Sequence, residues 1–488
     1  AVMANETVAA NCSQRATVDL SDLDNFTFAG GFISVAGSGS SGANNQPAGT
    51  FLLAKTNVIT ANRASSTTGT IRVSHNPGGN ATGAAENLLE LGQENTINTI
   101  YLRVGGDKAL NGGAMRFRSG LINPTLKLRG TNGMDGMPLL TIGDNWDAAT
   151  SVKSTGVVDL SGGTVDASVD TLHVARTFNN GSSTSSSGSG DGTLTFTAGT
   201  MTVDNVYLGC QGRNNRGTGT GVINVGGNAT LAVGTLYIAN DRGTELGTGI
   251  GTLNIDGGAV TVSGDIVEND ASATVSGADG SSTIHITNNG VLNLQPPGDL
   301  APGNITVDTL NFSSGTITNY GTLGLNTVNV LSPATDFTVY PGQALTAVGS
   351  GNSPVGTLTV NGNLLLTNAT LHCELDNALS GDLVNVSGTL TLAGANQVDI
   401  NMVNGNLAVG DYLLMTYGSG FAGGTSNLQV GGLLAGSRYT FAFSVNPYVT
   451  LTVGGAQPGS VSLTWAGDGA GNLWDLTNSV NWNANTEK

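Results

Sequence analysis

Long apolar runs are absent from this sequence, and so is any excess of positive charge. No stretch of about 18 apolar residues occurs, which argues against a membrane-spanning helix. Only 17 Lys and Arg stand against 34 Asp and Glu, giving a formal net charge of −17. Nucleic acids and anionic lipids are bound through basic surfaces, so this acidic balance argues against both as partners.

Charged and aromatic residues are scarce as well. Charged residues make up 10 % of the chain and aromatic residues 5 %, whereas an average domain is about one quarter charged. Disordered chains can have unusual compositions too, but they are poor in β-branched residues and lack alternation. Here Val, Ile, Leu and Thr alternate with small polar residues, and glycine contributes 74 residues. We therefore expect ordered β-structure with many turns.

The three cysteines are far apart in the sequence. Cys12, Cys210 and Cys373 form no CxxC motif and no Cys/His spacing, which argues against a metal or redox centre. One disulfide with a thiol left over and three buried thiols both fit this spacing. The first residues, AVMANETVAA, lack the basic start and apolar run of a signal peptide. Because Lys is rare and Gly, Asn, Thr and Ser are common, the composition favours a secreted or cell-surface protein whose signal peptide is absent from this chain.

What the sequence does contain is a repeat of about thirty residues between Gly156 and Leu294. Four units open GVVDLSGGTVDASVDTLHVA (156–175), GTLTFTAGTMTVDNVYLG (192–209), GVINVGGNATLAVGTLYIA (221–239) and GTLNIDGGAVTVSGDIV (251–267), and a degenerate fifth unit follows at 282–294. Each unit is too short to bury an apolar face alone, so the units must stack on one another.

The third and fourth units indicate how the stack is built. Their aligned pairs include Ile223 with Leu253, Asn224 with Asn254, and Val225 with Ile255. Alternation with period two places the aliphatic set inside and the polar set outside. Gly-Gly pairs at 162–163, 226–227 and 257–258 permit the positive φ of sharp corners. Neighbouring units would lie about 4.8 Å apart, so we expect ladders of aliphatic and of Asn/Thr side chains.

These observations predict an all-β fold, a right-handed parallel β-solenoid (β-helix) with an irregular N-terminal cap and a C-terminal β-sandwich-like segment. A β-sandwich of ordinary hairpins ranks second, because it does not predict aligned units. The expected parts are a β-rich cap or early rungs (1–150), clear repeats (151–295), degenerate rungs (296–370), a β-sandwich-like closing segment (371–456) and the start of a further β module or assembly tail (457–488). Residues 84–94 are the one short helix candidate.

Several segments share a recurring pattern beyond the clear repeats. They are GTLNIDGGAVTVSGDI (251–266), GTLTVNGNLLLTNATL (356–371), GDLVNVSGTLTLAGA (381–395), GDYLLMTYGSG (410–420) and the Trp-bearing run at 464–482. They resemble the autotransporter-associated β-strand repeats of large secreted bacterial surface proteins. The resemblance extends from roughly residue 150 onward. It implies a passenger-like extracellular β-helix used for adhesion, surface display or fibre building.

Parallel β-helices can also carry polysaccharide lyases and hydrolases, so carboxylate clusters matter. Such sites need spaced carboxylates, or carboxylates around Ca²⁺ with a basic residue. Asp166 and Asp170 share a strand phase, and Asp265, Glu268 and Asp270 crowd one turn. No Lys or Arg accompanies either group in sequence, so we interpret them as solvated turn residues. The histidines are scattered, at His75, His173, His285 and His372.

No GxSxG, HExxH or P-loop motif is present, and we predict neither enzymatic activity nor a bound cofactor. The segment GDGAGN (467–472) has the oxygen-rich character of a Ca²⁺ loop without EF-hand spacing. A glycine-rich turn is the favoured interpretation, which leaves Ca²⁺ as a weak cofactor candidate. Trp465, Trp474 and Trp482 could stack on sugar rings or clasp a small β module, and the clasp is favoured.

The favoured function is a non-enzymatic extracellular structural protein, a β-solenoid subunit of a surface filament, sheath or layer that self-associates. The alternative is an adhesin or carbohydrate-binding surface protein, with glycans as partners through the three tryptophans. A polysaccharide lyase or hydrolase is the second alternative.

Overall fold

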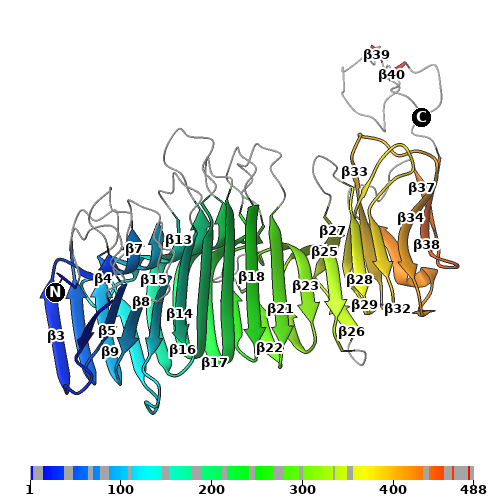
Figure 1. Cartoon of the computed structure of the whole chain (residues 1–488). Coiled ribbons are helices and arrows are strands. Elements are labelled where there is room, and N and C mark those ends of the chain that lie inside the picture. Colours follow the sequence, from blue (N-terminus) through cyan, green and yellow to red (C-terminus); the bar gives the residue numbers. More distant parts are fainter. Residues whose placement is uncertain are drawn as a thin grey trace, which may run out of the picture.

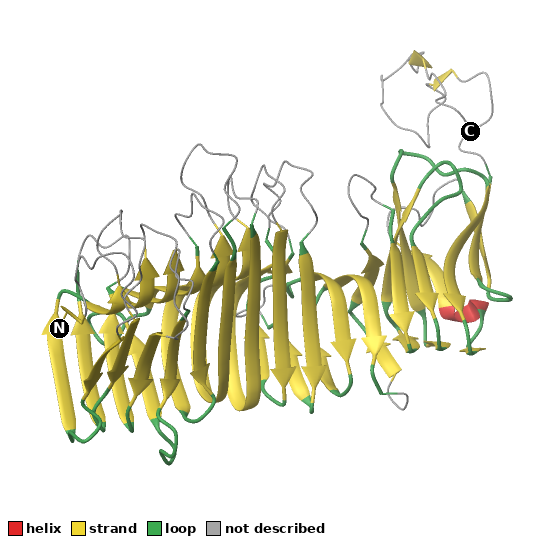
Figure 2. Ribbon diagram, viewed as in Figure 1, coloured by secondary structure: helices red, strands yellow, loops and turns green. Residues whose placement is uncertain are grey.

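A computed structural model gives the fold of the chain. It describes residues 2–3, 15–37, 48–63, 70–76, 87–107, 112–145, 153–177, 188–211, 217–240, 248–268, 280–295, 301–332, 336–348, 355–431, 439–455, 464–465 and 482–483. These residues are mostly β-strand, with one short 3-10 helix, η1 (Thr425–Asn427), drawn red in Figure 2. Over these ranges, no helix is long and apolar enough to cross a membrane.

Most strands lie parallel in three ladders, here named sides A, B and C, which the chain visits in this order again and again. One passage through the three sides is called a rung. Each strand pairs with the equivalent strand about 20 to 40 residues away, as in the register of β17 (Thr218–Ile238) with β18 (Thr248–Asp256). The molecule is therefore elongated along the stacking direction, with the N-terminus at one end (Figure 1).

The strands of each side follow one another in chain order. The long strands bend at the corners, so that different parts of one strand belong to different sides. Side A comprises β2 (Arg15–Asp19), β5 (Ala48–Leu52), β8 (Asn87–Leu91), β11 (Gly113–Phe117), β14 (Ser154–Leu160), the first parts of β16 (Gly190–Gln211) and β17, then β18, β21 (Ser281–Thr287), the second halves of β23 (Ile305–Phe312) and β25 (Thr322–Val330), β28 (Thr357–Asn361), β31 (Leu383–Val386) and β34 (Gly410–Tyr417).

Side B is the ladder in which pairing is interrupted once. It comprises β3 (Asn25–Gly30), β6 (Thr56–Ala61), β9 (Glu94–Thr99), β12 (Thr125–Arg129), the first part of β15 (Thr164–Thr177), the middle parts of β16 and β17, β19 (Ala259–Val262), β22 (Gly290–Asn293) and β24 (Gly315–Thr318), and then, as a separate four-stranded sheet, β26 (Asp336–Val339), β29 (Asn363–Thr367), β32 (Thr389–Ala393) and β35 (Gly420–Ala422).

Side C completes each rung. It comprises β1 (Val2–Met3), β4 (Ile33–Gly37), β7 (Ile71–Asn76), β10 (Tyr101–Asp107), β13 (Met137–Asp144), the last parts of β15, β16 and β17, β20 (Ile266–Val267), the first halves of β23 and β25, β27 (Ala344–Ala347), β30 (Thr370–Leu375), β33 (Asn396–Met402) and β36 (Leu428–Gly431).

The predicted alignment of the third and fourth repeats is confirmed. In the β17–β18 pair, Ile223 lies opposite Leu253 and Val225 lies opposite Ile255. The inward side chains form aliphatic columns through the core. One column, with every member almost fully buried, consists of Leu194, Ile223, Leu253, Ile284, Leu310, Val328 and Val360. Alternation therefore places one aliphatic residue per rung at the same core position.

The glycine corners are confirmed in part. Gly227 and Gly257 have positive φ, at 55° and 78°. Gly163 does not, but a Cβ at this position would lie 2.3 Å from the carbonyl oxygen of Pro124. This corner therefore needs glycine for close approach of the neighbouring backbone rather than for its φ.

The predicted helix at 84–94 is wrong. Residues Asn87–Leu91 form β8, which pairs in parallel with β5 and β11, and β9 begins at Glu94. Leu88, Leu89 and Leu91 are all buried. The local helix signal is overridden because both neighbouring rungs offer backbone partners and an apolar interior to this segment.

The two ends of the stack also differ from expectation. The described strands of region 1–150 are regular members of the three ladders rather than an irregular cap. Likewise, parallel pairing continues beyond residue 371 as far as β36. Antiparallel pairing in this segment involves β38 (Val449–Gly454), which pairs with β34 and with β37 (Thr440–Ser444). The β-sandwich-like segment is thus replaced by further rungs and by three strands, β34, β38 and β37, that pair antiparallel.

Candidate functional site

Side C contains a column of polar residues that is buried within the described structure. The same three-residue pattern recurs in successive rungs of side C. An aliphatic residue comes first, a residue with positive φ comes second, and the third residue lies next to the third residue of the rungs before and after it. The triplets are Val73-Ser74-His75, Val104-Gly105-Gly106, Ile142-Gly143-Asp144 and Val174-Ala175-Arg176. The left-handed residue turns the backbone sharply, so the third residue of each triplet comes to lie in one shared column.

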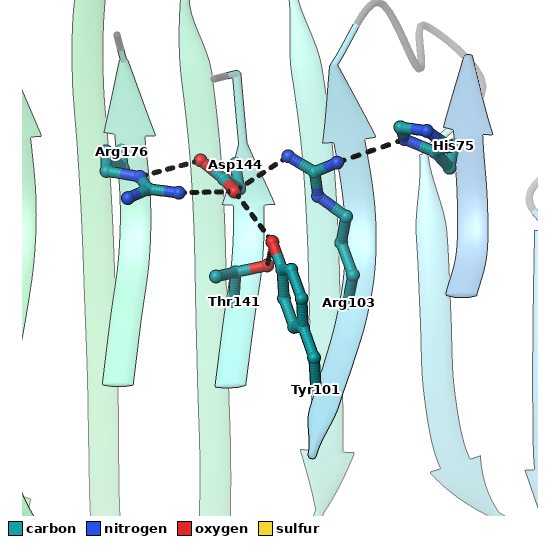
Figure 3. Close-up of polar contacts among 6 residues, drawn as sticks. All are labelled: His75, Tyr101, Arg103, Thr141, Asp144 and Arg176. Atoms are coloured by element: carbon teal, nitrogen blue, oxygen red, sulfur yellow. Dashed lines mark hydrogen bonds and ion pairs between the residues drawn. The ribbon is translucent and has the colours of Figure 1, made fainter. Parts of the chain in front are cut away.

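Gly106 leaves a vacant place in this column, and Arg103 of the same strand occupies it. A Cβ at Gly106 would lie 2.5 Å from Cδ of Arg103. The arginine runs along β10 and brings its guanidinium between His75 and Asp144, as Figure 3 shows. We call His75, Tyr101, Arg103, Thr141, Asp144 and Arg176 the buried charged cluster.

Asp144 is the centre of the buried charged cluster. Arg176 donates to it from Nε (2.9 Å to Oδ1) and from Nη2 (2.8 Å to Oδ2). Arg103 donates from Nη2 to Oδ2 at 2.9 Å, and the Tyr101 hydroxyl donates to the same oxygen at 3.3 Å. The carboxylate thus receives a bidentate arginine on one side and a second arginine on the other. Three successive rungs are connected through one side chain.

The other side of Arg103 faces a histidine. Nη1 of Arg103 lies 3.1 Å from Nδ1 of His75. Because a guanidinium only donates, Nδ1 must accept, which places the imidazole proton on Nε2. Burial, and secondly the charge of Arg103, hold the pKa of His75 well below its usual value. The imidazole is therefore neutral at neutral pH.

The electrostatics of Asp144 follow from two opposing effects. Burial alone would raise the pKa of this carboxyl, but the charges of Arg176 and Arg103 outweigh it and hold the pKa below its usual value. Burial likewise raises the pKa of the Tyr101 hydroxyl. Asp144 is therefore ionised, and Tyr101 protonated, at any ordinary pH.

This arrangement suits the fixing of register better than catalysis. Arg103 and Asp144 are only 1 % and 0 % exposed as side chains, so the described structure leaves no path for a polymer substrate to reach them. Arginine does not give up its proton at ordinary pH, and the six residues of the buried charged cluster include neither a thiol nor an acid of intermediate pKa. Its geometry instead specifies which residue stacks on which, because a shift by one residue would separate the charges.

A second polar column lies on the outer face of side A. Amide side chains of successive rungs donate to the rung before: Asn224 to Thr195 (2.8 Å), Asn254 to Asn224 (2.7 Å), Asn329 to Asn311 (2.7 Å) and Asn361 to Asn329 (2.8 Å). His285 occupies the same column between Asn254 and Asn311. The predicted asparagine ladder is therefore confirmed. The side-chain amides form hydrogen bonds with one another, so fewer of their donors and acceptors can bind a ligand.

Side B carries a hollow with several apolar and aromatic lining residues. A groove of about 460 Å³ lies between β24 and β26, where the ladder is interrupted. Its lining includes Phe312, Ile317, Tyr320 and Phe337, with Thr318, Asp336, Thr338 and Tyr340 around them. Grooves of this size and character are typical of ligand sites.

The structure describes some of the residues that sequence analysis proposed as sites. Trp465 and Trp482 lie opposite one another in the two-residue antiparallel pair of β39 (Thr464–Trp465) and β40 (Trp482–Asn483). Trp474 and the GDGAGN segment (467–472) lie outside the described residues. Cys210 and Cys373 are buried, and Cys12 lies outside the described residues.

The carboxylates and histidines that sequence analysis considered are also dispersed. Asp166 forms an ion pair with Arg129 at 2.6 Å. His173 stacks on Tyr207 with ring centroids 4.7 Å apart, and His372 lies 3.8 Å from Asp399. No group of three or more His, Cys, Asp or Glu in the described ranges is placed to hold a metal ion.

Sequence analysis missed the buried charged cluster, although a signal was present. The triplets VSH, VGG, IGD, VAR, LGC and IAN recur at 73–75, 104–106, 142–144, 174–176, 208–210 and 238–240. Each consists of an aliphatic residue, a small residue and a variable third residue. Alignment on this triplet, rather than on the opening glycine, would have placed His75, Asp144 and Arg176 in one column.

The comparisons with known proteins add no relative. No protein-family model, no curated protein and no solved structure matches this chain.

Proposed function

We propose that this chain is a parallel β-solenoid that acts as a non-enzymatic structural protein at the cell surface, a subunit of a filament, sheath or layer. The observation that carries the proposal is the continuity of sides A and C, in which every strand from β2 to β34 and from β4 to β36 pairs in parallel with its neighbours. We expect such a stack to resist bending, because each rung is paired with the next along both of these sides.

The charges support the same proposal. The residues best suited to chemistry, in the buried charged cluster, are enclosed and connect rungs instead of facing a cleft. The amide side chains on the outer face of side A are hydrogen-bonded to one another. The net charge of −17 makes the molecules repel one another and so opposes aggregation through their sides. Self-association through strand edges at the ends of the stack would build a polymer. The resemblance to autotransporter-associated repeats agrees with an extracellular location.

Electron microscopy of the purified protein tests this proposal. We expect rods of uniform width that lengthen with protein concentration, accompanied by a slow phase in light scattering. A monodisperse population of single particles at all concentrations would contradict it.

The adhesin is the second candidate, because Trp465 and Trp482 are paired across β39 and β40. Tryptophan is a residue type on which sugar rings stack. A glycan array probed with the protein and with Trp465→Ala tests this function. Glycan binding lost in the variant would favour the adhesin over the purely structural role.

A further inference from the structure

The interruption of side B leaves two strand edges facing one groove. Among the described residues, β24 pairs only with β22, and β26 pairs only with β29. Sides A and C remain paired through the same two rungs, by β23 with β25 and by β25 with β27. The break is therefore confined to one side of the stack.

The two rungs at the break differ in chain length on side B. Eleven positions separate Asn311 from Thr322, whereas fifteen separate their ladder partners Asn329 and Ala344. The ladder is held at both corners, where Leu331 N donates to Phe312 O (2.8 Å) and Ala344 N donates to Gly321 O (2.9 Å). The four extra residues lie between these corners, in the part of the rung where β26 is not paired with β24.

The groove between these edges has an apolar floor and a polar rim. Phe312 and Phe337 pack edge to face with ring centroids 6.2 Å apart, and both are nearly buried. Thr318 and Asp336 stand at the rim, and Tyr340 is 53 % exposed. A β-strand has the matching character, because alternate side chains point to a floor and to solvent.

We propose that the groove between β24 and β26 binds an extended peptide segment of a partner protein, which enters side B as an additional parallel strand. The walls are strand edges, whose N–H and C=O groups are recognised by the main chain of another strand. The segment would carry apolar side chains at alternate positions, which face the floor of the groove. It would lack acidic side chains, because Asp336 lies at the rim and the chain carries a net charge of −17.

A glycan fits this groove less well. Sugar rings bind by stacking on exposed aromatic faces, and Phe312, Tyr320 and Phe337 turn less than a tenth of their surface outward. Tyr340 is the one aromatic lining residue that is well exposed. The peptide proposal does not depend on the assembly proposed above, since it concerns a site in the middle of the stack.

The probe is a fluorescein-labelled synthetic peptide with the sequence of residues 362–368, GNLLLTN, which includes the strand that pairs with β26 on its other edge. Fluorescence anisotropy with the full chain should show saturable binding. The same peptide with proline in place of Leu365 should bind at least about tenfold more weakly, because proline removes a ladder hydrogen bond. Hydrogen exchange should slow at 315–318 and 336–339 when peptide is bound.

Two matched variants locate the site. Thr318→Trp fills the groove and should weaken peptide binding at least about tenfold. Thr261→Trp places the same side chain in the same column of side B, two rungs away, where the ladder is closed, and should leave binding unchanged. Absence of saturable binding, equal effects of the two variants, or equal binding of the proline peptide would overturn the proposal. Binding of neutral oligosaccharides that is sensitive to Thr318→Trp, without peptide binding, would replace it with a glycan site.

Discussion

Asp144 shows how strongly a single side chain can constrain the register between neighbouring rungs. It has no exposed surface and receives hydrogen bonds from two arginines that belong to the neighbouring rungs. A buried ion pair adds little net stability compared with an apolar core, but removal of one partner leaves the others buried without compensation. The cluster is therefore a strong constraint on register even if it contributes little to the overall free energy of unfolding.

We expect Asp144→Ala to lower the free energy of unfolding by about 3–5 kcal/mol, because Arg103 and Arg176 lose their shared carboxylate. Asp166→Ala is the matched control, since its ion pair with Arg129 is at the surface, and it should cost at most about 1 kcal/mol. Urea denaturation followed by circular dichroism gives both values. Equal losses in the two variants would show that the buried charged cluster is no more important than a surface pair.

A second buried carboxyl should make stability depend on pH. Asp382 accepts hydrogen bonds from the backbone N–H groups of Gly356 (2.7 Å) and Glu374 (3.0 Å). Burial, and secondly the hydrogen bond with the Glu374 side chain, raise the pKa of Asp382 from its ordinary value of 3.8 to about 8. The folded chain therefore retains a proton that the unfolded chain releases between these two values.

Stability contributed by this proton is complete below pH 3.8 and is lost as pH rises towards 8. We expect the free energy of unfolding to fall by up to about 1.4 kcal/mol per pH unit across this window. Urea midpoints measured from pH 5 to pH 8 provide the test. Asp382→Asn should flatten the dependence, whereas Asp411→Asn, at an exposed position, should leave it as it is. An unchanged slope in Asp382→Asn would contradict this account.

At the scale of elements, the side C triplets show that one position with positive φ holds glycine in some rungs and alanine or serine in others. The residues with positive φ in this column include Ser74, Gly105, Gly143 and Ala175. A Cβ at Gly143 would lie 1.9 Å from the backbone oxygen of Asp191, which belongs to a later rung. Alanine is accommodated at 175, so the neighbouring backbone, and not φ alone, decides which residue is accepted.

Substitution at these two positions should therefore give different results. Gly143→Ala combines left-handed strain of about 1 kcal/mol with a backbone clash and should cost more than about 2 kcal/mol. Ala175→Gly exchanges strain for chain entropy and should change stability by less than about 1 kcal/mol. Thermal unfolding of both variants measures the difference. A mild Gly143→Ala would mean that the rungs can shift at this corner.

The sequence predicts the repeating part of the fold well and the cluster poorly, for one physical reason. Period-two alternation reports which residues face the core, so it predicts the pairing of Ile223 with Leu253. The alternation does not report the direction in which a long polar side chain extends. Arg103 lies on the outward phase of its strand, and only the absence of a side chain at Gly106 lets it enter the neighbouring column. The prediction of a helix at 84–94 is wrong for a related reason. The strands that pair with β8 are distant in sequence, so the local pattern does not report them.

At the scale of the whole molecule, the break in side B divides a stack that is otherwise continuous. The rungs on either side of it share two paired ladders where other rungs share three. In a repeat protein, stability is approximately the sum of rung energies and of the interfaces between neighbouring rungs. The interface between the β24 rung and the β26 rung should therefore be the weakest in the middle of the stack, and opening should begin there.

Native-state hydrogen exchange in low urea tests this expectation. Amides of β24 and β26 should exchange through openings of lower free energy than those of β19 and β22, which occupy equivalent positions in the closed part of side B. Thr318→Trp, by covering the apolar floor, should slow exchange in β26, and Thr261→Trp should not. Uniform exchange along side B would mean that the corner hydrogen bonds at Leu331 and Ala344 hold these rungs together as firmly as a complete ladder does. The groove would then be a rigid feature of the surface instead of a joint in the rod.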